Sequence, residues 1–205
     1  MSSVRAKMSV FPVVVLTIVA ACGLAAAQEP EATEAELPPG MTAEAMAAWQ
    51  KAASPGPEHE MLASMAGNWT FKGTFWMAPD APSMESSGTA ERKMIFGGRI
   101  LVEKVKSEWQ GESFEGLAMT GFDNVSCSYW GTWVDSMGTG IMLSSGTCAE
   151  GSCEFTGTYN DPMTGGPKTV RMTLTSEGNR EVHQSFEPGP EGEFMSMEVV
   201  YTRVE

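Results

Sequence analysis

The sequence predicts an all-β protein, an antiparallel up-and-down β-barrel of about ten strands with a short N-terminal helix that closes one end. From Gly67 onward, apolar and polar residues alternate with the two-residue period of strands. Short segments rich in Gly, Asn, Asp and Pro interrupt the alternation, so consecutive strands pair antiparallel. An open sheet of this size would expose two long edges, whereas an even number of strands lets the first and last strands join.

The first residues are typical of an export signal. Two basic residues precede an apolar run from Val10 to Val19, and small residues follow, so we expect a signal peptide over residues 1–27. The motif Val-Ala-Ala-Cys that ends at Cys22 is similar to the lipobox of bacterial lipoproteins, in which the signal would be residues 1–21 and Cys22 would carry a lipid. Both routes stay open. Both predict an exported protein, periplasmic or secreted, that touches a membrane through a lipid on Cys22 at most.

The charge balance bears on the choice of partners. The chain has 13 basic and 26 acidic residues, a net charge of −13, and removal of the signal peptide makes it more negative. This acidity disfavours nucleic acids and anionic membranes as partners. The favoured explanation is solubility of an exported protein, and the alternative is an acidic interaction surface. The sequence leaves the oligomeric state open.

A linker and two short helices precede the barrel. Residues 28–56 are acidic and rich in Pro and Ala, which predicts a flexible linker with one short helix. Thr42 is placed to cap that helix, which runs through Ala53. A second helix is expected over residues 57–66, because a proline and two glutamates occupy its first turn. The barrel domain is then residues 57–205.

Each expected strand is an alternating run between two turn signals. In the first strand, Trp69, Phe71 and Phe75 share one face. The densest aromatic cluster follows later, where Tyr129 and Trp133 share a face. We expect strands near residues 67–77, 86–96, 99–109, 114–122, 127–134, 140–147, 153–160, 168–176, 181–187 and 193–203.

Successive turns alternate between the two ends of such a barrel, which separates the loops into two sets. The end that carries the helix receives the turns near residues 97–98, 123–124, 149–152 and 178–179. The opposite end, which we call the mouth, receives the loops near residues 78–87, 110–111, 135–139, 161–167 and 188–192.

Two aspartates at the mouth are candidates for chemistry. Asp135-Ser136-Met137 and Asp161-Pro162-Met163 lie in mouth loops, where paired carboxylates can act as acid and base or bind a cation. Aspartate at the start of a loop is also what a turn requires, and we favour that interpretation. Ser136 has no histidine nearby in the sequence, so a serine hydrolase site is not indicated.

The cysteines of an exported protein are expected to be oxidised. A turn centred on Glu150-Gly151 puts Cys148 opposite Cys153, and the preceding hairpin puts Cys127 opposite Cys148. We expect one disulfide, with Cys148–Cys153 favoured, and one remaining thiol. A metal site built on the three thiolates lacks an evident fourth ligand, so no metal is expected.

The histidines do not form a recognisable site. His59-Glu60 begins like a zincin helix, but position 63 is alanine, so the second histidine of that motif is missing. We expect His59 to pack in the cap of the barrel. His183 lies on an expected strand with no partner nearby in sequence. No cofactor is predicted.

Gly67-Asn68-Trp69 resembles the G-x-W signature of the lipocalin superfamily, in which an arginine of the last strand stacks over the tryptophan. Arg203 fits that role, because it ends the last strand and alternates in phase with Tyr201. The resemblance therefore implies a barrel floor made of Trp69 and Arg203, with a cation–π contact of about 0.5–2 kcal/mol.

Over about residues 55–204 the chain is similar to a bacterial family known as domain of unknown function 1579. The matching segments are PGPEHEML, AGNW, GGRILVE, GFDN, TWVDSMGTGIM, DPMTG and MEVVYTR. This resemblance implies a lipocalin-like barrel and no established activity. The three cysteines of the barrel lie outside the family pattern, as does Phe122, where the pattern has tyrosine.

These features favour a non-enzymatic exported barrel that binds a small apolar or amphipathic ligand. The sixteen methionines suit an adaptable apolar pocket, although they also fill cores. One alternative is an enzyme with a site at the mouth that uses Asp135, Asp161 and Arg171. Another is an interaction protein tethered through Cys22. The identity of the ligand stays open.

Overall fold

The computed structural model describes residues 39–205. The expected signal peptide, Cys22 and the start of the linker lie outside the described residues. The helices are α1 (Ala43–Ala53) and α2 (Pro57–Ser64). The strands are β1 (Gly67–Phe75), β2 (Met84–Ile95), β3 (Ile100–Trp109), β4 (Glu112–Asp123), β5 (Ser128–Asp135), β6 (Met142–Ala149), β7 (Ser152–Asp161), β8 (Gly166–Glu177), β9 (Arg180–Gly189) and β10 (Gly192–Arg203). Neither helix of this part of the chain is long and apolar enough to cross a membrane.

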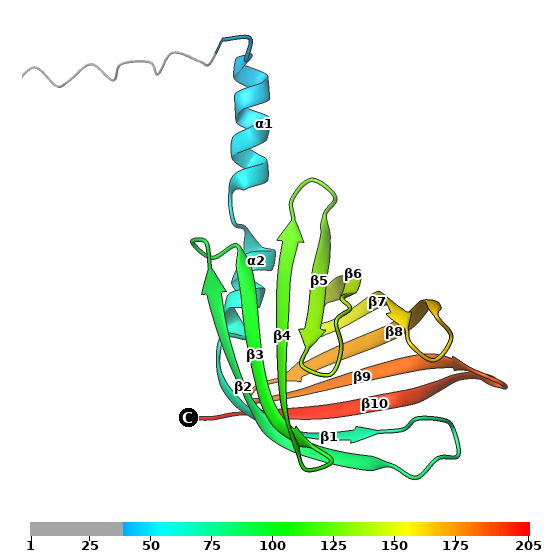
Figure 1. Cartoon of the computed structure of the whole chain (residues 1–205). Helices are drawn as coiled ribbons and strands as arrows, with labels where there is room; N and C mark the ends of the chain where they lie inside the picture. The colour runs from blue at the N-terminus through cyan, green and yellow to red at the C-terminus, as the bar shows by residue number, and fades with distance from the viewer. Residues whose placement is uncertain (1–38) are drawn as a thin grey trace, which may run out of the picture. The chain divides into compact units, whose positions relative to one another are not determined.

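The ten strands form a closed antiparallel barrel, which confirms the predicted fold class. Each strand pairs with its neighbours in sequence, and they follow one another around the barrel (Figure 1). The first and last strands close it, with Trp69 opposite Arg203 at one end of the seam and Phe75 opposite Met197 at the other. Because the barrel is closed, every strand has a paired neighbour on both sides.

The strand boundaries differ from the expected ones by a few residues. The expected first strand through Met77 is too long, because β1 ends at Phe75 and Met77 is exposed in the mouth loop. Trp76 still donates its backbone N–H to the carbonyl of Ser196, where the register of β10 shifts. The second helix ends at Ser64, and two tighter turns follow it over Met65 and Ala66.

Helix α2 closes the barrel at the end opposite the mouth. It contacts β2, β3 and β4. Leu62 and Met65 are buried and pack against Leu101 and Tyr129, which are inward-facing residues of β3 and β5. His59 is also buried, and its Nδ1 accepts a hydrogen bond from the backbone N–H of Gly56 at 3.0 Å. The apolar stripe of this helix therefore belongs to the barrel core.

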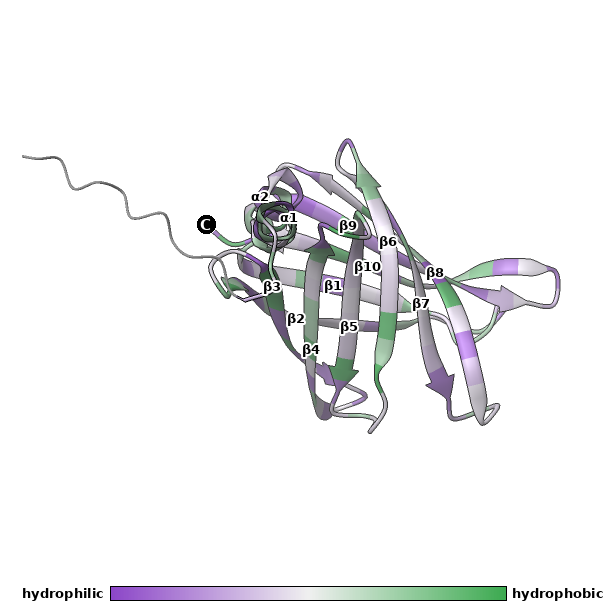
Figure 2. Ribbon diagram, turned by 90° about the horizontal axis from the view of Figure 1, so that it is seen from above, coloured by the Kyte–Doolittle hydropathy of each residue, from purple (hydrophilic) through white to green (hydrophobic). Residues whose placement is uncertain are grey.

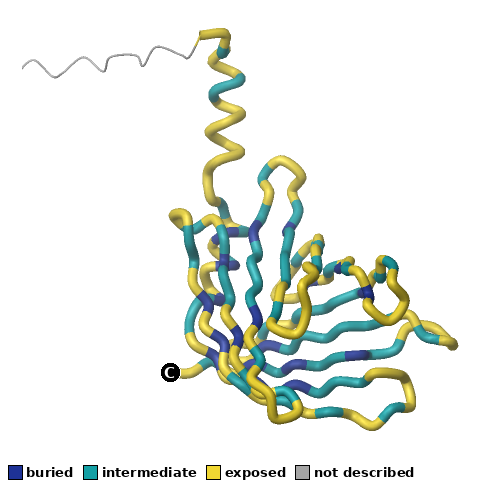
Figure 3. Tube along the Cα trace, viewed as in Figure 1, coloured by how far each residue is buried: buried dark blue, intermediate teal, exposed yellow. Residues whose placement is uncertain are grey.

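Helix α1 contributes nothing to that core. Thr42 caps it as expected, with its hydroxyl accepting from the N–H of Ala45 at 3.1 Å. No residue of α1 is buried, and the helix is exposed along almost its whole length in Figure 3. Its C-terminal end is held by Asn124 and Arg99, which donate to backbone carbonyls between Lys51 and Ser54.

The barrel interior contains two packed clusters. One lies around Trp69, Phe71, Val199 and Tyr201, on the seam between β1 and β10. The other is the contact of α2 with β3 and β5 described above. Hydrophobic and hydrophilic residues are mixed along the strands, as the alternation requires (Figure 2). Residues of both clusters also line the space inside the barrel.

Candidate functional site

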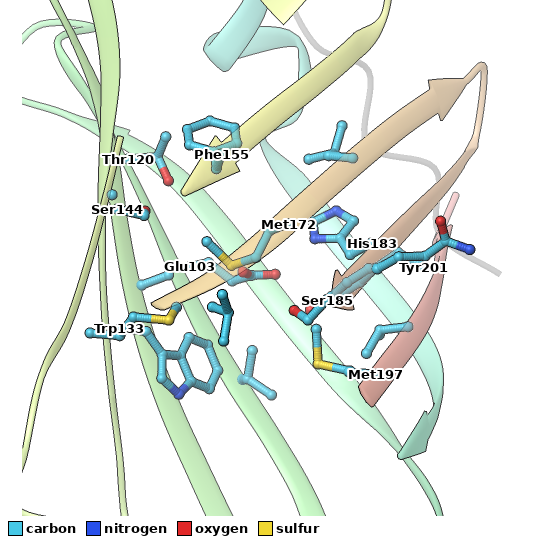
Figure 4. A pocket seen from close by; sticks show the side chains of 18 of the residues that line it. Glu103, Thr120, Trp133, Ser144, Phe155, Met172, His183, Ser185, Met197 and Tyr201 are labelled. Carbon is cyan, nitrogen blue, oxygen red and sulfur yellow. The ribbon is translucent and has the colours of Figure 1, made fainter. Parts of the chain in front are cut away.

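A cavity of about 580 Å³ occupies the barrel interior. It extends from Leu62 and Met65 of the closing helix to Met137 at the mouth. Its wall is mostly apolar, and ten of its side chains are labelled in Figure 4. Apolar side chains of the wall include Phe114, Trp133, Met142, Phe155, Met172 and Met197. Pockets for small molecules commonly measure about 300–1,000 Å³, so this cavity has room for one.

The inward-facing aromatic rings lie against the barrel wall. Trp133 packs over Gly116, where a Cβ atom would come within 2.4 Å of the indole ring. The indole Nε1 donates to Asp135 Oδ2 at 2.8 Å, and the ring stacks on Phe114 at 6.4 Å between centroids. Glycine at position 116 therefore allows a large side chain to lie flat, which leaves the lumen open.

A buried charge cluster lies at the closed end of the cavity. The side chain of Arg92 is 2% exposed, and its Nε donates to Glu103 Oε1 at 2.9 Å. Its Nη1 donates to Glu181 Oε2 at 2.6 Å, and the side chain of Glu181 is 1% exposed. His183 Nε2 lies 3.2 Å from the same oxygen of Glu181. Two carboxylates thus converge on one guanidinium.

Aromatic rings surround this guanidinium. The Cζ atom of Arg92 lies 4.7 Å from the ring centre of Trp69 and 4.6 Å from that of Tyr201. The Nη2 atom of Arg92 is buried and has no hydrogen-bond partner among residues 39–205. A buried donor without an acceptor is costly, so the polar cluster is incomplete at this atom.

The ionisation of the cluster follows from its contacts. Burial alone would lower the pKa of Arg92, but the charges of Glu103 and Glu181 outweigh it and raise the pKa. Burial alone would raise the pKa of Glu181, but its hydrogen bond with His183 and the charge of Arg92 lower it below the ordinary value. Burial raises the pKa of Tyr201. The guanidinium and the Glu181 carboxylate are therefore both charged at neutral pH.

We expect Glu181 to make the stability of the barrel depend on acid. A carboxyl whose pKa is lowered by folding stabilises the fold above its unfolded pKa, and that contribution is lost as the pH falls through the folded value. From about pH 5 to about pH 3, the melting temperature of the wild type should therefore fall more steeply than that of Glu181→Gln. Thermal unfolding followed by circular dichroism at several pH values measures both slopes.

The matched control is Glu108→Gln, at an exposed position of β3, which should keep the wild-type slope. Equal slopes for Glu181→Gln and the wild type would contradict the assigned role of Glu181.

The closed end also contains the predicted contact between Trp69 and Arg203. The Cζ atom of Arg203 lies 4.3 Å from the indole ring centre. The guanidinium donates to the carbonyls of Ala66 and Ser64, each at 2.6 Å, which ties the last strand to the end of α2. Gly67 has a φ of +138°, and a Cβ atom there would lie 2.6 Å from Arg203 Nη1. The glycine of the G-x-W signature therefore makes room for the arginine.

The side chains of the two mouth aspartates accept hydrogen bonds from residues of their own turns. Asp135 accepts from the backbone N–H of Met137 at 2.9 Å, in addition to the indole of Trp133. Asp161 accepts from the backbone N–H of Met163 at 2.9 Å and from the hydroxyl of Thr164 at 3.3 Å. These are the contacts of turn-forming residues, which is the interpretation that we favoured.

The other mouth candidates do not assemble with them. Ser136 bonds to β4, with its hydroxyl accepting from the N–H of Glu115 at 3.1 Å. Arg171 donates to Glu193 at 2.9 Å and lies over the ring of Phe186. Asp135 and Met137 line the cavity, whereas Asp161, Met163 and Arg171 are not among its lining residues. The described residues thus show no joint site of two carboxylates and an arginine.

The disulfide is the one that we favoured from the sequence, Cys148–Cys153. Cys148 and Cys153 form a disulfide at directly opposite positions of β6 and β7, and both line the cavity. Cys127 is a free thiol, exposed in the turn before β5. Within residues 39–205, no group of three His, Cys, Asp or Glu side chains is arranged to hold a metal ion. His59 packs edge-on against Phe122, with 6.0 Å between ring centroids.

The cluster of Arg92, Glu103 and Glu181 was not predicted from the sequence. The signal that could have indicated it was the position of charged residues among the inward-facing residues of the strands. Glu103 occupies an inward position between Leu101 and Val105, and Arg92 follows the buried Ala90 by two residues. A charged residue in an inward phase marks a buried polar group, and it needs a partner of opposite charge on a neighbouring strand.

The comparisons with known proteins concern the barrel as a whole. A family model described as "Protein of unknown function (DUF1579)" matches residues 54–203. None of the curated proteins matches the chain. The match covers both the closing helix and all ten strands, so it includes every residue of the cavity described above.

Proposed function

Because the chain belongs to the family of proteins of unknown function DUF1579, we propose its function from the barrel interior: it binds one small apolar or amphipathic molecule there. The observation that carries the proposal is the cavity of about 580 Å³ with its mostly apolar wall. Export to the periplasm or beyond is part of the proposal, and it is supported by the signal pattern in residues 1–27.

Burial of apolar surface supplies the binding energy in this proposal. Each Å² of apolar surface removed from water contributes about 25 cal/mol, so an alkyl or ring system that fills the cavity gains several kcal/mol before the cost of association. The flexible side chains of Met142, Met172 and Met197 can adapt to ligands of different shape. Access is through the mouth, where Trp76, Met77 and Met137 lie at the cavity rim.

A substitution that fills the cavity tests this function. Ser144 faces the cavity from β6, opposite Gly131, and Ser144→Phe would place a ring in the lumen (Figure 4). We expect the variant to bind the neutral apolar dye Nile red at least about tenfold more weakly than the wild type, which corresponds to about 1.4 kcal/mol. Titration with the dye, followed by its fluorescence, gives the dissociation constant.

The neighbouring residue provides a matched control. Ser145 is exposed on the outer face of the same strand, so Ser145→Phe adds the same ring outside the barrel and should leave the dissociation constant unchanged. Melting temperatures of both variants establish that they are folded. Absence of dye binding to the wild type, or equal binding by both variants, would exclude a ligand in the cavity.

A further inference from the structure

The charges around the cavity are unbalanced. Among the described residues that line it, the acidic side chains are Glu103, Asp135 and Glu187, and the guanidinium is that of Arg92. Glu187 forms an ion pair with Lys168, and Asp135 accepts hydrogen bonds in its own turn. Among the charged groups that line the cavity, those at the closed end are therefore Arg92 and Glu103 of the Arg92 cluster.

The cluster itself already pairs its charges. Arg92 binds the carboxylates of Glu103 and Glu181, so one positive charge faces two negative charges, and His183 lies beside the second of them. An anionic ligand would bring a third negative charge to a site of low dielectric constant. A cationic ligand would face a guanidinium that the structure holds between two aromatic rings. Either charge would also lose its hydration on entry.

Two residues of the cluster that line the cavity, Arg92 and Glu103, nevertheless have unused hydrogen-bonding capacity. The donor is Arg92 Nη2, which is buried and has no partner among residues 39–205. The acceptor is the carboxylate of Glu103, whose side chain is 13% exposed and lies among the side chains that surround the cavity (Figure 4). Its hydrogen bond with Arg92 is made through Oε1, which leaves Oε2 for another donor.

We propose that the ligand is an uncharged amphiphile with a hydroxyl head group, seated with that head at the Arg92 cluster and its apolar body toward the mouth. A hydroxyl group both accepts and donates, so it can bond to Arg92 and to Glu103 at once. It also adds no charge to a set of ion pairs that is already formed. This inference rests on the proposed function and specifies the chemical class of its ligand.

Three probes of equal chain length test the proposal at neutral pH: dodecanol below its solubility limit, and dodecanoate and dodecylamine below their micelle concentrations. Each competes with Nile red for the wild-type protein. We expect dodecanol to bind at least about tenfold more tightly than dodecanoate and than dodecylamine, because only the alcohol matches both groups without adding a charge.

The substitution Glu103→Gln links the preference to the cluster. Glutamine keeps an acceptor for Arg92 and removes one negative charge, so the guanidinium and Glu181 become a balanced pair. We expect dodecanoate to bind this variant at least about fivefold more tightly than it binds the wild type, whereas the affinity for dodecanol should change less. Glu108→Gln, on the exposed face of the same strand, should leave all three affinities unchanged.

The outcomes separate this inference from the proposed function. Tighter wild-type binding of the acid or the amine, or equal binding of all three, overturns the hydroxyl proposal and leaves a ligand in the cavity. Unchanged dodecanoate affinity in folded Glu103→Gln also overturns it. Failure of dodecanol to displace the dye overturns it as well. The response of the dye itself to Ser144→Phe decides the proposed function independently.

Discussion

Replacing Arg92 with leucine should lower the free energy of unfolding by about 3–5 kcal/mol, the usual cost of breaking a buried ion pair. The substitution leaves the carboxylate of Glu181, with a side chain 1% exposed, without its guanidinium partner. His183 remains beside it but lies 3.2 Å away and is charged only when protonated. For a domain of this size the melting temperature should fall by roughly 10 °C. Urea denaturation and thermal unfolding measure the two quantities.

The adjacent residue is the matched control. Lys93 forms an ion pair with Glu91 on the outer face of β2, where the two side chains are 72% and 47% exposed. Lys93→Leu removes the same charge and should cost less than about 1 kcal/mol, because exposed ion pairs contribute little. The double variant Arg92→Leu with Glu181→Leu should be more stable than Arg92→Leu alone, since it removes the uncompensated charge. Equal losses in Arg92→Leu and Lys93→Leu would contradict the buried cluster.

Replacing Trp69 with alanine should cost about 3–5 kcal/mol, in the range for large-to-small substitutions in cores. Trp69 is 1% exposed, and its indole Nε1 donates to the carbonyl of Met65 at 3.1 Å. Its ring lies beside both Arg92 and Arg203 and edge-on to Tyr201. The substitution therefore removes the ring that contacts the closing helix, the β1–β10 seam and the Arg92 cluster. Urea denaturation followed by circular dichroism gives the loss.

Trp49→Ala serves as the control for this prediction. Trp49 lies on α1 and is 69% exposed, so its replacement should change the free energy of unfolding by less than about 0.5 kcal/mol. A loss below about 1 kcal/mol for Trp69→Ala would mean that the closed end of the barrel contributes little to stability.

The sequence predicted the barrel well because its period and turns are local signals. The turn at Glu150-Gly151 alone fixes the register that places Cys148 opposite Cys153. The even number of strands allows the barrel to close, as it does, and the lipocalin resemblance adds the contact between Trp69 and Arg203. Boundaries were less accurate where tertiary contacts decide them, as at Met77, where the strand gives way to the mouth loop.

The charge cluster at the cavity could not be found in the same way. Arg92 and Glu181 are 89 residues apart in the sequence, and they meet only because the barrel closes. For the mouth aspartates, in contrast, the position in the fold was predicted and the local contacts were not. Their loops were assigned to the right end, but the orientation of their side chains toward their own backbone is a local detail that residue type alone leaves open.

The seam between β1 and β10 also has a consequence for how the molecule forms. These are the first and last strands of the barrel, and Trp69 of β1 pairs with Arg203 of β10, so the barrel stays open until β10 has docked. Until then β1 presents an open edge that can pair with another chain. Contacts of such large sequence separation form slowly. A chain in which the C-terminal strand has not yet docked is therefore the form most open to association with another chain.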